Sequence, residues 1–222
     1  MQFVYHEKAG EKSLVVDASE YAHILKVRRT KIGDILSWRN LRNDTIHDYK
    51  AVEINKKNAT WELVGSKELS TCADKKFVLG WCVVEPKIIE KTLPMFNEMG
   101  LSKIVFVYAD FSQKQFKIDL ERARRILINS SQQCGRSDLL EIEILESVEA
   151  YLKKYPKSAV LNFSDNKISQ SLHVESLLVG PEGGFSKKEL QIMRQKEVFG
   201  LDCPLILRSE TAAIAICAKV LL

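Results

Sequence analysis

A glycine-rich segment near the C-terminus carries residue types that can hold a ligand. The sequence "LLVGPEGGFSKKEL" (177–190) runs from an apolar stretch through three glycines and a proline into a charged helical pattern. Gly183 and Gly184 permit positive φ angles and a close approach of a ligand to bare backbone. Ser186, with Glu189 three residues later, forms a capping box pattern, which predicts a helix that begins at about residue 187. The segment would therefore present backbone N–H groups at a helix N-terminus.

The composition of this loop discriminates among ligands. It contains neither the GxxxxGK[ST] nor the GxGxxG pattern of phosphate-binding loops. The carboxylate of Glu182 would repel a phosphate, so a neutral or cationic ligand suits the loop better. A tight Gly/Pro turn without a ligand is the alternative interpretation.

A second polar segment follows in "PLILRSETAAIAICAKVLL" (204–222). Its pattern predicts a short strand at 204–207 and then a helix, with Arg208 and Glu210 where the strand ends and the helix begins. Ligands of α/β sheets bind at such strand ends. An acidic residue suits a helix start, whereas a cation opposes the helix dipole, so Arg208 indicates a functional role. An ion pair between Arg208 and Glu210 is the alternative. The two segments together predict two walls of one pocket.

Alternating strands and helices position both segments. From about residue 74 the sequence predicts a mostly parallel sheet with helices on both faces. The expected strands are 76–84, 103–108, 141–145, 158–163, 176–180 and 204–207. The expected helices are 87–100, 119–135, 147–155, 186–197 and the C-terminal segment.

The first 70 residues have a different sequence pattern. Short β-branched or aromatic runs separated by turn formers predict a small β-barrel with one helical insert at 19–27. The change from this strand pattern to alternating strands and helices predicts a domain boundary between residues 72 and 73. Trp38, Trp61 and Trp81 are expected in the cores.

Bulk properties exclude several classes. The 222 residues have ordinary hydrophobic (45%) and charged (28%) contents and a net charge of +4, which permits a nucleic-acid partner without demanding one. The N-terminus lacks the pattern of a signal peptide, and the longest apolar run is too short to span a bilayer. Five scattered cysteines and four isolated histidines indicate reduced thiols, a cytoplasmic protein and no metal site.

These motifs resemble a known family. "LLVGPEGGFSKKEL" followed by "LILRSETAAIA" is similar to the two C-terminal signatures of the bacterial 16S rRNA uracil-N3 methyltransferases, the small-subunit methyltransferase E family of the SPOUT class. "EYAHILKVRRTKIGD" (20–34), "FNEMGLSKI" (96–104) and "ERARRILINSSQQCGRS" (121–137) resemble other family segments, so the similarity covers essentially the whole chain.

The resemblance implies a fold and a reaction. Residues 1–72 would form a PUA-like, RNA-binding β-barrel, and 73–222 a SPOUT α/β domain with a deep C-terminal trefoil knot. The knot would bind S-adenosylmethionine, and the protein would be a homodimer. The substrate would be the N3 atom of a uridine in 16S rRNA, within the assembled 30S subunit.

The resemblance also assigns residues. The cofactor would be held by Leu178, Gly180, Pro181, Glu182, Gly183, Gly184, Leu205, Leu207, Ser209 and Thr211. The matching RNA-binding positions are Gln133 and Arg136, with Arg29 and His23 in the N-terminal motif. Lys26, Arg28, Arg29 and Lys31 form a basic cluster that we expect to bind RNA phosphates. A second basic cluster spans 114–136, for which a solvated helix face is the alternative.

The chemistry assigns the catalytic candidates. S-adenosylmethionine carries a sulfonium and an ammonium but no phosphate, which agrees with the composition of the glycine loop. Uracil N3 must lose a proton, so a base or a stabilising cation is required. Arg208 and Arg136 are candidate bidentate donors to uracil or phosphate. Glu210 is a candidate base, although a role at the helix start explains it equally well.

The sequence departs from the family pattern at several places. Cys203 and Leu205 stand where the family has glycine and arginine, Phe111 stands where it often has arginine, and Gln2 is the nearest polar residue to a missing N-terminal arginine. Each departure removes a possible RNA contact. The alternatives are therefore a SPOUT methyltransferase for another RNA position, such as a ribose 2′-oxygen or a tRNA base, and a non-catalytic RNA-binding protein of ribosome assembly.

Overall fold

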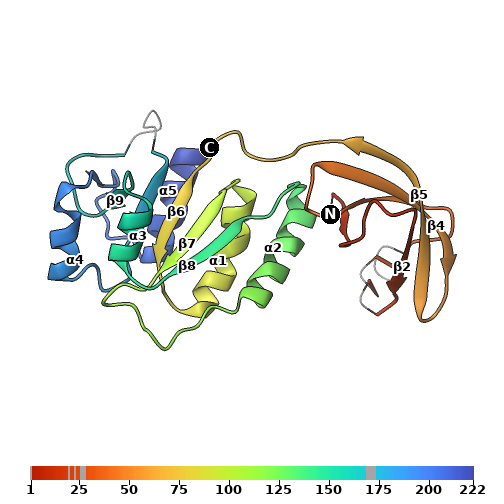
Figure 1. The fold of residues 1–222 in the computed structure, drawn as a ribbon, viewed down its shortest axis with the longest axis horizontal. Coiled ribbons are helices and arrows are strands. Elements are labelled where there is room, and N and C mark those ends of the chain that lie inside the picture. The colour runs from red at the N-terminus through yellow and green to blue at the C-terminus, as the bar shows by residue number, and fades with distance from the viewer. Residues whose placement is uncertain (1, 20, 23, 26–28, 169–173) are drawn as a thin grey trace. The chain divides into compact units, whose positions relative to one another are not determined.

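The computed structural model of the chain (Figure 1) describes residues 2–19, 21–22, 24–25, 29–168 and 174–222. The chain divides into two compact units. The first consists of Met1–Cys72 and Ser131–Asp138, and the second of Ala73–Ser130 and Leu139–Leu222. The segment 131–138 thus clusters with the N-terminal unit, although the sequence pattern assigns it to the second domain.

The N-terminal unit is a curled, mainly antiparallel five-stranded sheet. Its order is β1-β3-β4-β5-β2, and only the edge pair of β1 with β3 is parallel. The long β4–β5 hairpin contains two register shifts, and such irregularities bend and twist a sheet. The strands are β1 (Val4–Tyr5), β2 (Ser13–Asp17), β3 (Ile35–Arg39), β4 (Thr45–Ile54) and β5 (Asn58–Glu68).

Aromatic side chains fill the concave side of this sheet. Strand β2 alternates between exposed and buried residues, as a strand with one covered face must. Trp38 and Trp61 are fully buried, with ring centroids 5.2 Å apart in an edge-to-face arrangement. The expectation that both tryptophans belong to the core is confirmed. Part of the expected helical insert at 19–27 lies outside the described residues.

The second unit is built on a parallel six-stranded sheet with the order β11-β9-β10-β6-β7-β8. This confirms the predicted parallel sheet. Strand β10 lies between β9 and β6, so the chain returns to the centre of the sheet after it has formed an outer strand. The strands are β6 (Val78–Cys82), β7 (Lys103–Val107), β8 (Glu141–Leu145), β9 (Ala159–Leu161), β10 (Ser176–Val179) and β11 (Val198–Phe199).

Helices cover both faces of this sheet. Leu79 and Trp81 of β6 pack in one cluster with residues of α1 (Pro86–Glu98), α2 (Leu120–Cys134) and α5 (Ser209–Leu221). Cys82 packs in another cluster with residues of α3 (Val148–Lys154) and with Met193, which follows α4 (Lys187–Ile192). Successive side chains of β6 point to opposite faces of the sheet, so this strand contributes to both clusters. Figure 1 shows the sheet with helices on its two faces. Trp81 is fully buried, as expected.

The expectation of a strand at 204–207 is wrong. These residues form a loop, and Leu205 and Ile206 are exposed. The apolar composition favours a strand, but a strand requires a partner, and the edge position beside β9 is taken by Val198–Phe199. The expected helix at 186–197 ends early as well, with α4 followed by a 3₁₀ turn at Met193–Gln195.

Candidate active site

A cavity of about 840 Å³ opens at the C-terminal ends of β9 and β10 in the second unit. Such strand ends are where α/β sheets bind ligands. Three segments line the cavity: the loop after β9, the glycine loop after β10, and the loop that precedes α5. The lining residues are Leu161–Asp165, Lys167, Val179–Phe185, Gly200, Leu201, Cys203, Leu205–Ser209 and Ala212.

A buried serine fixes the start of the glycine loop. The Ser209 hydroxyl donates a hydrogen bond to the Gly180 carbonyl (2.6 Å) and accepts one from the indole Nε1–H of Trp81 (2.8 Å). Trp81 lies on central strand β6 and is fully buried. These two contacts join strand β6, the glycine loop and the first turn of α5. The two loops that the sequence predicted to wall one pocket are therefore in contact.

The predicted capping box fixes the other end of the loop. The Ser186 hydroxyl accepts from the Glu189 backbone N–H (3.2 Å), and the Glu189 carboxylate accepts from the Ser186 backbone N–H (2.8 Å). The buried Glu189 carboxylate also accepts from the backbone N–H of Asp110 (2.9 Å), and the Ser186 hydroxyl donates to the Asp110 carboxylate (2.5 Å). The capping box is confirmed, and it also ties the loop after β7 to the start of α4.

A buried cysteine lies near this carboxylate. Burial raises the pKa of the Cys82 thiol well above its usual range, and the negative charge of Glu189 acts in the same direction. The thiol is therefore protonated at neutral pH. Cys82 is a packing residue of β6 and not a nucleophile.

A side chain would be crowded at two glycines of the loop, and a third glycine adopts a left-handed conformation. A Cβ atom on Gly180 would lie 3.0 Å from the Phe185 ring, and one on Gly183 would lie 3.3 Å from the Phe111 Cβ atom. Gly184 has a φ of +72°, whereas Gly183 is not among the glycines with positive φ. Gly183 thus allows close packing against Phe111, and Gly184 supplies a backbone conformation that favours glycine.

Arg208 lies at the cavity with its side chain exposed. It is the N-cap residue of α5, and among the described residues it forms no ion pair, with Glu210 or any other carboxylate. Glu182 is exposed on the opposite loop and also lines the cavity. The cavity therefore offers one positive and one negative side chain next to bare backbone, which suits a ligand with charges of both signs.

Three further predicted residues lie outside the lining. Glu210 is half-buried in the first turn of α5, and its Oε2 atom is buried without a hydrogen-bond partner among the described residues. Leu178 is buried against the opposite face of the sheet, and Thr211 is exposed in α5. The predicted cofactor residues that do line the cavity are Gly180, Pro181, Glu182, Gly183, Gly184, Leu205, Leu207 and Ser209.

The loop after β9 is the part of the cavity that sequence reasoning missed. It contributes five lining residues from Asn162 to Lys167, among them Phe163 with an exposed fraction of 82%. The loop has no glycine and no motif. Its contribution follows from the strand order, which places β9 beside β10, and no local pattern reveals that order.

The predicted RNA-binding residues are distributed as follows. Lys26, Arg28 and His23 lie outside the described residues. Arg29 is exposed and has a positive φ of 54°, and Gln133 is exposed at the end of α2. Both belong to the N-terminal unit.

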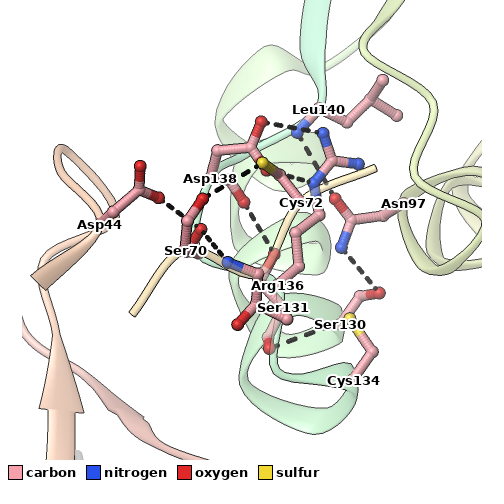
Figure 2. A network of polar contacts seen from close by, with 12 residues as sticks. Asp44, Ser70, Cys72, Asn97, Ser130, Ser131, Cys134, Arg136, Asp138 and Leu140 are labelled. Carbon is pink, nitrogen blue, oxygen red and sulfur yellow. Dashed lines mark hydrogen bonds and ion pairs between the residues drawn. The ribbon is translucent and has the colours of Figure 1, made fainter. Parts of the chain in front are cut away.

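Arg136 is buried in the N-terminal unit. Figure 2 shows its guanidinium facing Asp138, with Nε 2.6 Å and Nη2 3.2 Å from the two carboxylate oxygens. Only 5% of the residue is exposed. The neighbouring Ser137 hydroxyl donates to the Asp44 carboxylate (2.7 Å). In this conformation the bidentate capacity of Arg136 serves the fold of its own unit.

The second basic cluster is at the surface of the second unit. Arg122 pairs with Glu90 of α1 (2.7 Å). Lys114, Lys117 and Arg125 are exposed. Across the described residues there is no group of three or more potential metal ligands. No helix in the described part of the chain is long and apolar enough to cross a membrane.

Comparison with known proteins identifies the relatives of the chain. The family described as an RNA methyltransferase domain matches residues 72–221. The Helicobacter pylori ribosomal RNA small subunit methyltransferase E is 41% identical over 96% of both chains. A probable rRNA-methyltransferase from Porphyromonas gingivalis shares the fold, with a TM-score of 0.84, 22% identity, and coverage of 98% of this chain and 96% of that one. A ribosomal RNA small subunit methyltransferase E from Neisseria gonorrhoeae, solved with bound S-adenosyl methionine, also shares the fold. Its TM-score is 0.80, with 21% identity and coverage of 98% of this chain and 95% of that one. The chain belongs to the ribosomal RNA small subunit methyltransferase E family.

Proposed function

We propose that this protein transfers a methyl group from S-adenosylmethionine to N3 of a specific uridine in 16S rRNA, within the assembled 30S subunit. The observation that carries the proposal is the cavity of about 840 Å³, which is walled by the glycine loop and the loop before α5. Membership of the family supports the reaction class, and the ribosomal substrate makes the protein a cytoplasmic one.

The residues around the cavity fit this cofactor. S-adenosylmethionine combines an ammonium, a sulfonium and a carboxylate, and the cavity offers Glu182, Arg208 and the bare backbone of the glycine loop. The contacts of Ser209 and Ser186 hold both ends of that loop. The loop is therefore ordered before a ligand arrives, which reduces the entropic cost of binding. When bound, the cofactor would supply an activated methyl group.

Side chains of this protein must then promote the loss of the proton on uracil N3. The N3–H proton must leave as the nitrogen attacks, so a negative charge develops on the base. Arg208 is exposed at the cavity and without an ion-pair partner among the described residues, so it can stabilise that charge. Glu210 is the proposed base, and its Oε2 atom is buried without a hydrogen-bond partner among the described residues. Because Glu210 does not line the cavity, this role requires the first turn of α5 to rearrange when the substrate binds. A substrate-binding role for Arg136 requires it to exchange its partner Asp138 for RNA.

The finer features of the fold are also proposals. A deep trefoil knot is supported by the tight crossing at Gly200, whose N–H donates to the Asn166 carbonyl (2.8 Å) and whose carbonyl accepts from Ile168 (3.0 Å). A Cβ atom on Gly200 would lie 2.3 Å from the Ser164 carbonyl oxygen. The curled sheet of the N-terminal unit supports a PUA-like, RNA-binding role.

We also propose a homodimer. Leu205 and Ile206 are 73% and 83% exposed on the loop before α5. Two adjacent exposed aliphatic side chains beside a cavity are typical of a surface that a partner covers.

Nucleoside mass spectrometry tests the proposed function. Unmodified 30S subunits, naked 16S rRNA and bulk tRNA are each incubated with the protein and labelled S-adenosylmethionine. We expect 3-methyluridine in the 30S subunits alone. Label in tRNA or in a ribose would refute the target, and no label together with no cofactor binding would favour the non-catalytic RNA-binding protein.

The role of Arg208 is tested separately. We expect Arg208→Ala to reduce turnover about 100-fold or more, since removal of one group that stabilises a developing anion costs about 10²–10³ in rate, while cofactor affinity changes far less. Arg194→Ala, at an exposed arginine that does not line the cavity, is the matched control. Equal turnover of the two variants would remove Arg208 from the mechanism.

A further inference from the structure

Two aromatic side chains of this chain are exposed, and the proposed cofactor site accounts for one of them. All phenylalanines, tyrosines and tryptophans lie in the described part of the chain, and only Phe111 (56%) and Phe163 (82%) are exposed. Phe163 lines the cavity, whereas Phe111 does not. Phe111 therefore needs a separate explanation.

The position of Phe111 is fixed by its neighbours. It lies in a turn closed by a hydrogen bond from the Ser112 backbone N–H to the Ala109 carbonyl (3.0 Å). Asp110 is held from the other side by the Glu189 carboxylate (2.9 Å to its N–H) and by the Ser186 hydroxyl (2.5 Å). The ring is thus presented from a backbone that is anchored to the start of α4.

Phe111 also lies against the wall of the cavity. Its Cβ, Cγ and Cδ2 atoms are 3.3–3.7 Å from the position that a side chain on Gly183 would take, and Gly183 itself lines the cavity. The ring therefore lies beside a residue of the cavity lining. With 56% of Phe111 exposed, much of the residue remains accessible to a ligand.

The chain around Phe111 has the composition of a single-stranded RNA contact. Gln113, Lys114, Gln115 and Lys117 follow Phe111 closely and are all exposed. Lysines contact phosphates, and amides can pair with base edges. An aromatic ring among such residues is a surface on which an unstacked base can lie, and stacking tolerates any base because every base has a π-face.

We propose that Phe111 is a stacking platform for a nucleobase of the RNA substrate, at the target nucleotide or directly beside it. The platform holds an unpaired base next to the cavity and so positions the target for methyl transfer. This inference rests on the proposed RNA methyltransferase function. Phe111 acts as a positioning residue and does not touch the cofactor.

Substitutions that separate the aromatic ring from simple apolar bulk test the platform. Stacking of one base contributes about 5- to 150-fold to affinity. We expect Phe111→Ala and Phe111→Leu to lower kcat/KM for RNA by a factor in that range, and Phe111→Trp to retain it. Leucine preserves an apolar contact with Gly183 but has no π-face, so its failure to rescue identifies stacking. Cofactor affinity and thermal stability should stay unchanged in all three variants.

A fluorescence measurement reports on the base directly. The three native tryptophans are fully buried, so the indole of Phe111→Trp is the exposed emitter. We expect unmodified 30S subunits to quench its emission and to protect it from iodide, and S-adenosylmethionine alone to do neither. Leu120→Trp, at an exposed position that begins α2, is the control for mere proximity of RNA.

The outcomes separate this inference from the function on which it rests. A wild type that methylates RNA, together with fully active Phe111→Ala and unquenched Phe111→Trp, would overturn the platform alone. A wild type that methylates nothing would overturn the proposed function, and the quenching experiment would still decide whether a base lies on residue 111. A changed oligomeric state of Phe111→Ala with normal turnover would assign the ring to a protein interface and also overturn the proposal.

Discussion

Replacement of Ser209 by alanine removes a hydroxyl group that joins three elements around the cavity. The side chain accepts from Trp81 Nε1 and donates to the Gly180 carbonyl, and both contacts are short. Alanine fits the same space, so the change deletes two hydrogen bonds without overpacking. Two buried or half-buried polar groups lose their partner.

The two losses differ in size. Trp81 is fully buried, so its unsatisfied N–H should cost about 1–3 kcal/mol. The Gly180 carbonyl is half-buried at the edge of the cavity and can regain water, so its loss should cost about 1 kcal/mol. We expect Ser209→Ala to lower the free energy of unfolding by about 2–4 kcal/mol. The roughly 1 kcal/mol lost at Gly180 also loosens the glycine loop. Because 1 kcal/mol corresponds to a factor of about five, the Kd for the cofactor should rise by up to about fivefold.

Ser158→Ala provides a matched control. Ser158 is also buried, and its hydroxyl contacts the Tyr151 hydroxyl (2.9 Å) and donates to the Ala159 carbonyl (3.0 Å). It precedes β9 and does not line the cavity. Urea unfolding followed by circular dichroism measures stability, and calorimetry with S-adenosylmethionine measures the Kd.

The reasoning requires the two variants to separate. Both should be destabilised, but only Ser209→Ala should bind the cofactor more weakly. An equal rise in Kd for both variants would mean that general destabilisation weakens binding. A destabilised Ser209→Ala with an unchanged Kd would mean that Ser209 does not position the loop.

Three further variants test other contacts. Gly183→Val should raise the Kd for S-adenosylmethionine more than tenfold in calorimetry, because even its Cβ atom would lie 3.3 Å from Phe111. The free energy of unfolding should change by no more than about 1–2 kcal/mol. Normal affinity would remove this loop from the cofactor site. Glu189→Ala should lower the free energy of unfolding in urea by about 2–4 kcal/mol, because it leaves two backbone N–H groups without their acceptor. Glu189→Gln keeps an acceptor oxygen and should lose less stability. Equal losses in the two variants would contradict the role of Glu189 as a hydrogen-bond acceptor. Burial, and secondarily the charge of Arg39, lowers the pKa of His47 in the folded state. The unfolded state therefore binds more protons than the folded state below about pH 6.5, so wild-type stability should fall as the pH drops through and below about 6.5. The His47→Gln variant should lack that part of the fall when urea midpoints are compared.

Much of the fold could be predicted from local sequence patterns. The capping box at Ser186 and Glu189 involves residues three apart, so the sequence states it directly, and the structure contains it. The parallel sheet followed from the alternation of strand and helix patterns. The strand expected at 204–207 failed because strand formation depends on an available partner, which apolar composition does not encode.

The site was only partly accessible to such reasoning. Both motif-bearing loops line the cavity, but the loop after β9 joins them through strand order alone. Arg136 shows what residue type alone leaves out. Its residue type indicates a donor for uracil or phosphate, whereas the structure pairs it with Asp138 two residues later. The carboxylate in "RSD" was the available signal for that pairing.

The glycine loop unites these observations. Its ends are held by side chains from distant parts of the chain, Ser209 at Gly180 and Glu189 at Ser186. Between them, Gly183 and Gly184 carry no side chain, and a Cβ atom on Gly183 would lie only 3.3 Å from Phe111. Such a loop offers fixed N–H and carbonyl groups and needs little reordering when a ligand binds. We expect the selectivity of the loop to come from the charged residue at its margin, where the negative charge of Glu182 opposes phosphate.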